Sequence, residues 1–192
     1  MRIRSFVGEL VAVASVTGAL AISAASAEAQ RFYELAGGWN AVAQAASSGT
    51  DRFGSGPYLR GSVGLSVAPR TRIRFDGDAM VFRLQTEAPV PCPSQGCPHA
   101  FYDNHTRGVA ALTANGLLSL DSREFWYLIG GLGAYDIETQ VNSLHVGASV
   151  GVGLGIPVGL HDRVVIEATW HGLAPNSNGP GWLVPISVGF RF

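Results

Sequence analysis

Apolar and polar residues alternate with a period of two along two segments in the last third of the chain. Between residues 144 and 158 every even position is aliphatic, whereas the odd positions carry glycine, serine, histidine or proline. From Trp182 to Phe192 the even positions are again apolar, and Gly189 and Arg191 lie between them. Such alternation is typical of a β-strand whose two faces meet different surroundings. Both segments are therefore predicted to be strands with one apolar face.

Six further segments fit the same interpretation less regularly. The eight predicted strands span residues 31–43, 57–68, 72–85, 107–120, 124–135, 144–158, 163–171 and 181–192. In the third and seventh of these strands, the charged residues lie on the face opposite the aliphatic ones. Residues 125–135 are apolar on both faces, so the pattern leaves open which face of the fifth strand points inward.

The connections between these strands alternate in length. Short turns at 69–71, 121–123 and 160–162 alternate with longer segments at 45–56, 86–106, 136–143 and 172–180. Strands cross a lipid bilayer only in a closed sheet, because an open edge leaves main-chain groups without hydrogen bonds. The pattern predicts an all-β fold, an eight-stranded antiparallel up-and-down transmembrane β-barrel with the short turns and both chain ends on one side.

The first 29 residues have the layout of a cleavable signal peptide. Arg2 and Arg4 precede an apolar stretch, and a run of small residues follows it. Cleavage is expected after Ala27 or Ala29, which leaves residues 30–192 as a single barrel domain. A retained membrane anchor is the alternative, but Glu9 interrupts the apolar stretch.

The composition supports a surface that meets lipid. Charged residues make up 14% of the chain, against roughly 25% in ordinary soluble proteins, and lysine is absent. A soluble barrel with its apolar face turned inward around a ligand is the alternative, and it would have a sparsely charged exterior. The net charge of −1 argues against a nucleic-acid partner, which would require a basic surface.

The inward-facing charged residues are expected to pair with one another inside the barrel. Eight strands enclose an interior just wide enough for its own side chains, so a general diffusion pore is not expected. Buried charges need partners, and a rigid polar network in the lumen satisfies this need. Its predicted members are Arg60, Arg74, Asp76, Asp78, Glu167 and Arg191. The alternative is a proton or cation site around Asp76, Asp78 and Glu167.

Aromatic residues near the strand ends are predicted to form girdles at the level of the lipid headgroups. They are Tyr33, Trp39, Tyr58, Trp126, Tyr127, Tyr135, Trp170 and Trp182.

The final strand, with its sequence Ser187-Val-Gly-Phe-Arg-Phe192, resembles the closing strand of small bacterial outer-membrane barrels. The predicted barrel as a whole is similar to the eight-stranded OmpA-like and OmpX-like superfamily. This resemblance implies a monomer in the bacterial outer membrane, in contact with outer-membrane lipid. It also implies that Phe190 and Phe192 are read by the barrel-assembly machinery. The alternative for both residues, which is compatible with this role, is that they only face lipid.

The longest connection, 86–106, is predicted to be the main extracellular contact surface. Cys92 and Cys97 lie in it with a Pro/Gly-rich turn between them, and in an exported protein this favours a local disulfide that stiffens the loop. A surface metal site with His99 and His105 is the alternative, although the spacing fits no standard zinc motif. No metal or cofactor is predicted.

Catalysis is not expected. Lipid A deacylases of similar size place a serine two residues after a histidine near the end of the seventh strand. Here the residue two positions after His171 is Leu173, and Ser177 is displaced into the following loop. His171 is therefore interpreted as a rim residue that makes polar contacts. The sequence favours a structural or surface-interaction role. A carrier of a small hydrophobic molecule and, more remotely, an envelope-lipid enzyme are the alternatives.

Overall fold

The computed structural model describes residues 30–43, 52–88, 101–123, 125–138, 143–160, 162–174 and 181–192. The regular elements found in these ranges are all strands. They are β1 (Arg31–Ala43), β2 (Arg52–Phe53), β3 (Gly56–Ala68), β4 (Thr71–Ala88), β5 (Phe101–Ser119), β6 (Trp126–Ile137), β7 (Ser143–Pro157), β8 (Arg163–Leu173) and β9 (Trp182–Arg191). The described residues contain no helix that is long and apolar enough to cross a membrane.

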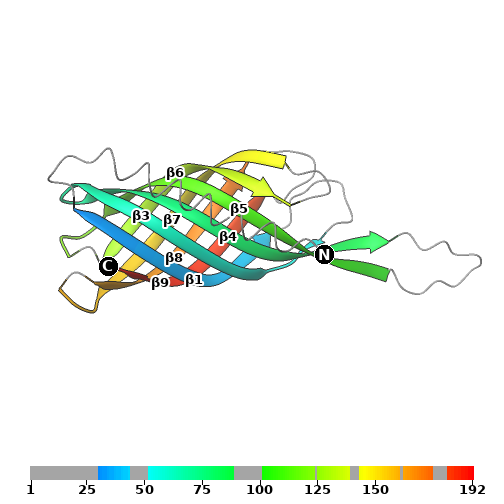
Figure 1. Ribbon diagram of the computed structural model, residues 1–192, viewed down its shortest axis with the longest axis horizontal. Helices are drawn as coiled ribbons and strands as arrows, with labels where there is room; N and C mark the ends of the chain where they lie inside the picture. The colour runs from blue at the N-terminus through cyan, green and yellow to red at the C-terminus, as the bar shows by residue number, and fades with distance from the viewer. Residues whose placement is uncertain are drawn as a thin grey trace, which may run out of the picture.

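Eight of these strands form a closed antiparallel barrel in which chain neighbours pair (Figure 1). The barrel closes between the first and last strands, where β1 pairs with β9 from Glu34↔Arg191 to Ala43↔Trp182. The two-residue strand β2 is added to the far end of β4, outside the main ladder. The predicted eight-stranded up-and-down barrel is confirmed.

The two ends of the barrel differ. The connections β3–β4, β5–β6 and β7–β8 are short, and the first and last residues of the barrel, Arg31 and Arg191, lie at the same end as these turns. We call this the turn end and the opposite end the loop end. In outer-membrane barrels short turns face the periplasm and longer loops face outside.

The exterior of the barrel is aliphatic and its interior is polar or packed, as the alternation predicts. Leu132, Leu144 and Val146 on the outside are 67%, 72% and 65% exposed, whereas Ser149 and Glu167 on the inside are each 1% exposed. The soluble alternative, with its aliphatic face inward, is therefore wrong. On the fifth long strand, β6, alternate residues from Tyr127 point inward, which fixes the face that the sequence left open.

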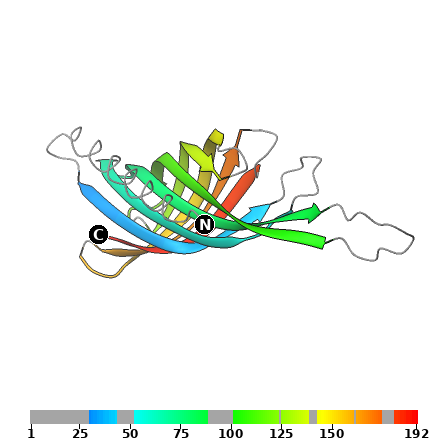
Figure 2. The same cartoon turned by 45° about the vertical axis from the view of Figure 1, so that its right-hand side comes forward.

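The predicted boundaries of most strands are close to those observed, but the predicted start at residue 107 is wrong. Pairing between β4 and β5 continues as far as Ala88↔Phe101, so residues 86–88 and 101–106 of the expected loop belong to paired strands (Figure 2). The reason is that the two strands satisfy each other's main-chain hydrogen bonds beyond the barrel wall. Cys92 and Cys97 lie outside the described residues, as do the predicted signal peptide, His99 and Ser177.

Of the eight residues predicted for the aromatic girdles, five face outward as a girdle requires, and the prediction is wrong for the other three. Tyr33, Trp39, Trp126, Trp170 and Trp182 are between 37% and 55% exposed on the outer surface. Tyr58, Tyr127 and Tyr135 are at most 5% exposed and point into the lumen. Their positions share the inward face of their strands, and an inward tyrosine is tolerated because its hydroxyl finds a partner there.

Candidate functional site

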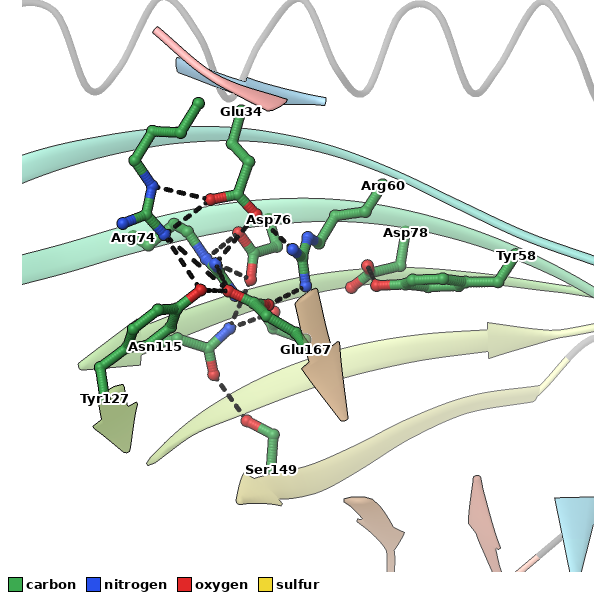
Figure 3. A network of polar contacts seen from close by, with 12 residues as sticks. Glu34, Tyr58, Arg60, Arg74, Asp76, Asp78, Asn115, Tyr127, Ser149 and Glu167 are labelled. Atoms are coloured by element: carbon green, nitrogen blue, oxygen red, sulfur yellow. Dashed lines mark hydrogen bonds and ion pairs between the residues drawn. The ribbon is translucent and has the colours of Figure 1, made fainter. Parts of the chain in front are cut away.

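A network of ion pairs fills the half of the lumen nearer the turn end (Figure 3). Its charged members come from five strands, and each side chain is at most 4% exposed. They are Glu34 on β1, Arg60 on β3, Arg74 and Asp76 on β4, Glu167 on β8 and Arg191 on β9. We call these six residues the lumen ion cluster. Three arginines face three carboxylates, so the cluster has no net charge.

Glu34 is the centre of one half of the cluster. Its Oε2 accepts two hydrogen bonds from Arg191, at 3.0 Å from Nε and 2.8 Å from Nη2. Its Oε1 accepts from Nη1 of Arg74 at 3.2 Å and from Nη2 of Arg60. One carboxylate thus joins three guanidinium groups across the seam at which the barrel closes.

Glu167 is the centre of the other half. Arg74 binds it as a fork, with Nη1–Oε1 at 2.6 Å and Nη2–Oε2 at 3.0 Å. Nη1 of Arg60 lies 2.5 Å from Oε2, and the hydroxyl of Tyr127 donates to Oε1 at 2.5 Å. Charge-assisted pairs of this kind are the strong hydrogen bonds of a protein interior, and forked pairs also fix orientation.

Neutral polar residues extend the cluster to the remaining strands. Asp76, which pairs with Arg74, accepts a hydrogen bond from Nδ2 of Asn115 at 2.7 Å. Ser149 in turn donates to Oδ1 of Asn115 at 2.6 Å. With Tyr127 on β6, Asn115 on β5 and Ser149 on β7, each of the eight long strands contributes at least one member to a continuous network. Side-chain contacts across the lumen thus connect all sides of the barrel wall.

The sixth predicted member of the lumen network, Asp78, lies opposite Arg60 in the β3–β4 ladder and bonds to a tyrosine. Its Oδ1 accepts a hydrogen bond from the hydroxyl of Tyr58 at 2.5 Å. His171 lies inside the lumen at 3% exposure, and its Nδ1 is 2.7 Å from the hydroxyl of Tyr135. His171 makes a polar contact two residues before the loop end of β8, and its side chain points into the lumen.

The alternative of a cation site around Asp76, Asp78 and Glu167 finds no support in the geometry. Asp76 and Glu167 are held by Arg74, and Asp78 is bound to Tyr58. Among the residues that the structure describes, no group of three or more metal-binding side chains is arranged to hold an ion.

Above the ion cluster, the lumen nearer the loop end contains polar residues, among them Asp78 and His171, and a group of mainly apolar ones. A set of buried side chains from six strands packs together there, and none is more than 9% exposed. They are Tyr58, Met80, Phe82, Val109, Ala111, Tyr135, Ile137, Leu173 and Leu183. We call this set the upper lumen cluster. Together the two clusters place packed side chains at both levels of the lumen, an arrangement that does not suit a general diffusion pore.

Sequence reasoning missed several members of the network. Glu34 could have been found, because Tyr33, Leu35 and Trp39 form an outward set that leaves Glu34 on the inward face. Tyr127 was assigned to the girdle, and Asn115 and Ser149 carry no signal beyond their parity along the strand. Neutral polar residues are common on inward faces, so parity alone does not show which of them join a network.

Phe190 and Phe192 lie on the exterior at 41% and 56% exposure, with their rings 6.2 Å apart. Phe192 exchanges main-chain hydrogen bonds with Tyr33 and its ring stacks on that of Tyr33 at 6.1 Å. Recognition of these two residues by the assembly machinery remains a prediction.

Comparison with known proteins rests on shape alone, because no family model and no curated protein match the sequence. Among solved structures, neisserial surface protein A superposes with a TM-score of 0.53 at 17% identity, over 84% of this chain and 97% of that one. The chain has the fold of small outer-membrane barrels. OprG from Pseudomonas aeruginosa (TM-score 0.49, 10% identity, 85% and 97% coverage) and Ail from Yersinia pestis (0.45, 11%, 85% and 99%) are also similar.

The fold and the aliphatic exterior together bear out the predicted fold family. The fold agrees with the predicted location in the bacterial outer membrane, and the aliphatic exterior suits contact with lipid.

Proposed function

We propose that this outer-membrane barrel acts at the cell surface through the β4–β5 hairpin, with the filled lumen serving as a rigid support. The observation that carries the proposal is the reach of this hairpin. Pairing of β4 with β3 begins at Tyr58↔Met80, and pairing of β5 with β6 begins at Val109↔Ile137. The β4–β5 ladder continues for eight further pairs beyond these points.

These eight pairs extend the hairpin by about 27 Å at roughly 3.4 Å per residue. Figures 1 and 2 show it projecting past the rim of the barrel. The β4 side is braced, because β2 pairs at Leu84 and Gln85 and Gly54 donates to the main-chain oxygen of Arg83 at 2.6 Å. The hairpin therefore continues two barrel strands rigidly into the external space.

The barrel below the hairpin is stiff because the ion pairs and hydrogen bonds of the lumen network join all eight long strands. Proteins use rigid scaffolds to present binding segments, because an ordered segment loses less entropy when it binds. A barrel that is braced by ion pairs across its lumen suits this role better than it suits transport.

The test is site-specific photo-crosslinking in the native envelope. A photoreactive phenylalanine analogue at Arg83 or Thr106, which are exposed at the base of the hairpin, should give a discrete adduct with a protein or a glycan. The same analogue at Leu132, on the lipid face, should give lipid adducts only. Replacement of residues 86–103 by Asn-Gly, a turn suited to a two-residue hairpin, should abolish the adducts while the barrel still folds.

The matched control replaces residues 139–142, between β6 and β7, by the same Asn-Gly turn. Adducts that persist in the shortened hairpin, or that disappear equally in this control, would rule out the hairpin as the contact surface.

A second candidate function, binding of a small hydrophobic molecule, is favoured by the upper lumen cluster. Its apolar side chains form the type of surface that such a ligand requires. Native mass spectrometry of mildly extracted protein should then show a retained molecule of defined mass. Ala111→Phe would fill the cluster and displace the molecule, whereas Ala110→Phe, on the outer face, would not. A bare protein mass in the unsubstituted chain would remove this candidate.

A further inference from the structure

Two buried polar side chains near the loop end of the lumen have hydrogen-bonding atoms without partners. Asn40 on β1 is 0% exposed, and neither its amide nitrogen nor its amide oxygen has a partner among the described residues. His171 on β8 is 3% exposed; its Nδ1 lies 2.7 Å from the hydroxyl of Tyr135, but its Nε2 has no partner there either. Buried polar groups are nearly always hydrogen-bonded, so two unpaired ones in one half of the lumen indicate a bound partner.

The neighbours of Asn40 in the sheet explain why the barrel wall offers its amide no partner. Its ladder partners are Gly56 on β3 and Pro185 on β9. Glycine has no side chain, and the side chain of proline has no polar atom. On the other side of β9, His171 lies opposite Leu183, which is also apolar. The two polar groups therefore point into the lumen from a part of the wall that cannot satisfy them.

The same two residues border the upper lumen cluster. The ring of His171 packs edge-on against that of Tyr135, with the ring centroids 5.7 Å apart, and Leu173 follows two positions later on the same inward face. Leu183, opposite His171, lies two positions before the ladder partner of Asn40 on the inward face of β9. Tyr135, Leu173 and Leu183 all belong to the cluster. Unpaired hydrogen-bonding groups thus lie beside an apolar surface.

Only β9 separates the two side chains in the wall. Two strand spacings of roughly 4.8 Å and a shift of two residues place their Cα atoms about 12 Å apart. Both side chains point inward from a curved wall, so their polar atoms are closer together than their Cα atoms. A molecule of a few atoms spans such a gap.

We propose that the loop-end half of the lumen binds a small uncharged molecule with an apolar body and one polar end, and that Asn40 and His171 hold the polar end. The amide offers both donors and an acceptor, and the imidazole nitrogen adds one further hydrogen bond. Ligand sites typically combine apolar side chains with a few polar groups that fix orientation. The charges of the lumen ion cluster pair with one another and Asp78 is bound to Tyr58, so a charged end would lack a counter-ion.

This inference rests on the second candidate function, binding of a small hydrophobic molecule, and adds the polar end by which the molecule is recognised. It is independent of the hairpin. An unpaired buried amide destabilises the protein that carries it, so Asn40→Leu is expected to stabilise the barrel. Loss of binding in this variant would therefore not be a loss of folding.

The test uses two probes of nearly equal shape, 4-ethylphenol and 4-ethyltoluene, which differ only in a hydroxyl in place of a methyl group. Each is titrated into the folded protein in lipid nanodiscs, and binding is measured by NMR from saturable shifts of the main-chain amide signals of the upper lumen cluster. 4-Ethylphenol should bind about tenfold more tightly, the effect of roughly one hydrogen bond. It should also shift the ring-nitrogen signal of His171, whereas 4-ethyltoluene should not.

Asn40→Leu should weaken binding of 4-ethylphenol about tenfold and leave that of 4-ethyltoluene unchanged. Ser62→Ala is the matched control. Ser62 also has a buried hydroxyl without a partner, but it lies opposite Glu34, in the half of the lumen nearer the turn end. Its removal should leave both affinities unchanged. If Asn40→Leu does not fold, as judged by its heat-dependent shift on gels, His171→Leu replaces it with the same expected result.

Three results would overturn the proposal. Equal affinity for the two probes would leave water as the partner of the two polar groups, and the second candidate function would stand without a recognised polar end. An unchanged affinity in the folded variant, or an equal loss in the Ser62 control, would show that these side chains do not hold the hydroxyl. Absence of saturable binding of both probes would remove the second candidate function together with this inference.

Discussion

Replacement of Glu167 by glutamine tests whether the lumen ion cluster stabilises the barrel. The substitution keeps the size of the side chain but removes one of three negative charges that face three arginines. It leaves one uncompensated positive charge in a lumen where Arg74 is only 1% exposed. The new amide group would also point donors at guanidinium groups that are themselves donors only.

The expected cost follows from this geometry. Glu167 receives the fork from Arg74, a contact from Arg60 and the hydroxyl of Tyr127. Removal of one partner from a buried pair typically destabilises a protein by about 3–5 kcal/mol, because the remaining charge stays buried. At about 1.4 kcal/mol per factor of ten, the ratio of folded to unfolded protein should fall by at least about 100-fold.

The assay is reversible urea unfolding in lipid vesicles, followed by the fluorescence of the four tryptophans, all of which lie on the exterior. Asp136→Asn is the control, because it removes a carboxylate that is exposed at the loop end. It should change the free energy of unfolding by less than about 0.5 kcal/mol. A loss below 1 kcal/mol for Glu167→Gln would refute the view that the cluster holds the barrel together.

Three further changes have defined outcomes. Gly153→Val should destabilise the barrel by about 1–3 kcal/mol, because a Cβ atom there meets the ring of Tyr127. Gly130→Val should be neutral, since its Cβ atom would meet nothing within 4 Å. Equal losses of unfolding free energy for the two variants in urea would contradict this prediction. Asn40→Leu should raise the free energy of unfolding by about 1 kcal/mol, because the buried amide has no hydrogen-bond partner among the described residues. A lower free energy of unfolding in this variant would contradict the prediction. Phe192→Ala should slow insertion in cells, measured by pulse-chase, more than it slows folding into pure lipid vesicles, and an equal effect in both would argue against its role as an assembly signal.

The sequence predicted the barrel well wherever lipid constrains it. β7 and β9 face lipid along nearly their whole length, so one face is uniformly aliphatic and the period of two is plain. The β4–β5 hairpin escaped prediction because its outer part does not face the bilayer. In a segment such as Phe101–Arg107, apolar and polar residues do not alternate, so the sequence does not indicate a strand. The segment is nevertheless a strand because it pairs with β4.

The lumen shows a different limit. Parity along each strand placed Arg60, Arg74 and Glu167 inside, because charges avoid the lipid face. It gave no information on which of them meet. Most of the contacts join residues far apart in the chain, such as Arg60 with Glu34, 26 positions apart, and Arg191 with Glu34, 157 positions apart. Which of these side chains meet depends on how far each strand is shifted along its neighbours around the whole barrel.

The pairing of β1 with β9 has a consequence for how the protein is made. All other neighbours in the barrel are consecutive along the chain and can zip up as hairpins, whereas this pairing joins the first strand to the last. Until it forms, two strand edges remain open, and open edges invite aggregation and are costly in lipid. The Glu34–Arg191 contact lies at this junction, so the charge pairing is completed only when the last strand arrives. A chain that ends before β9 therefore lacks both the closing ladder and one cation of the lumen ion cluster. Its sheet stays open, so proteases of the cell envelope can cleave it.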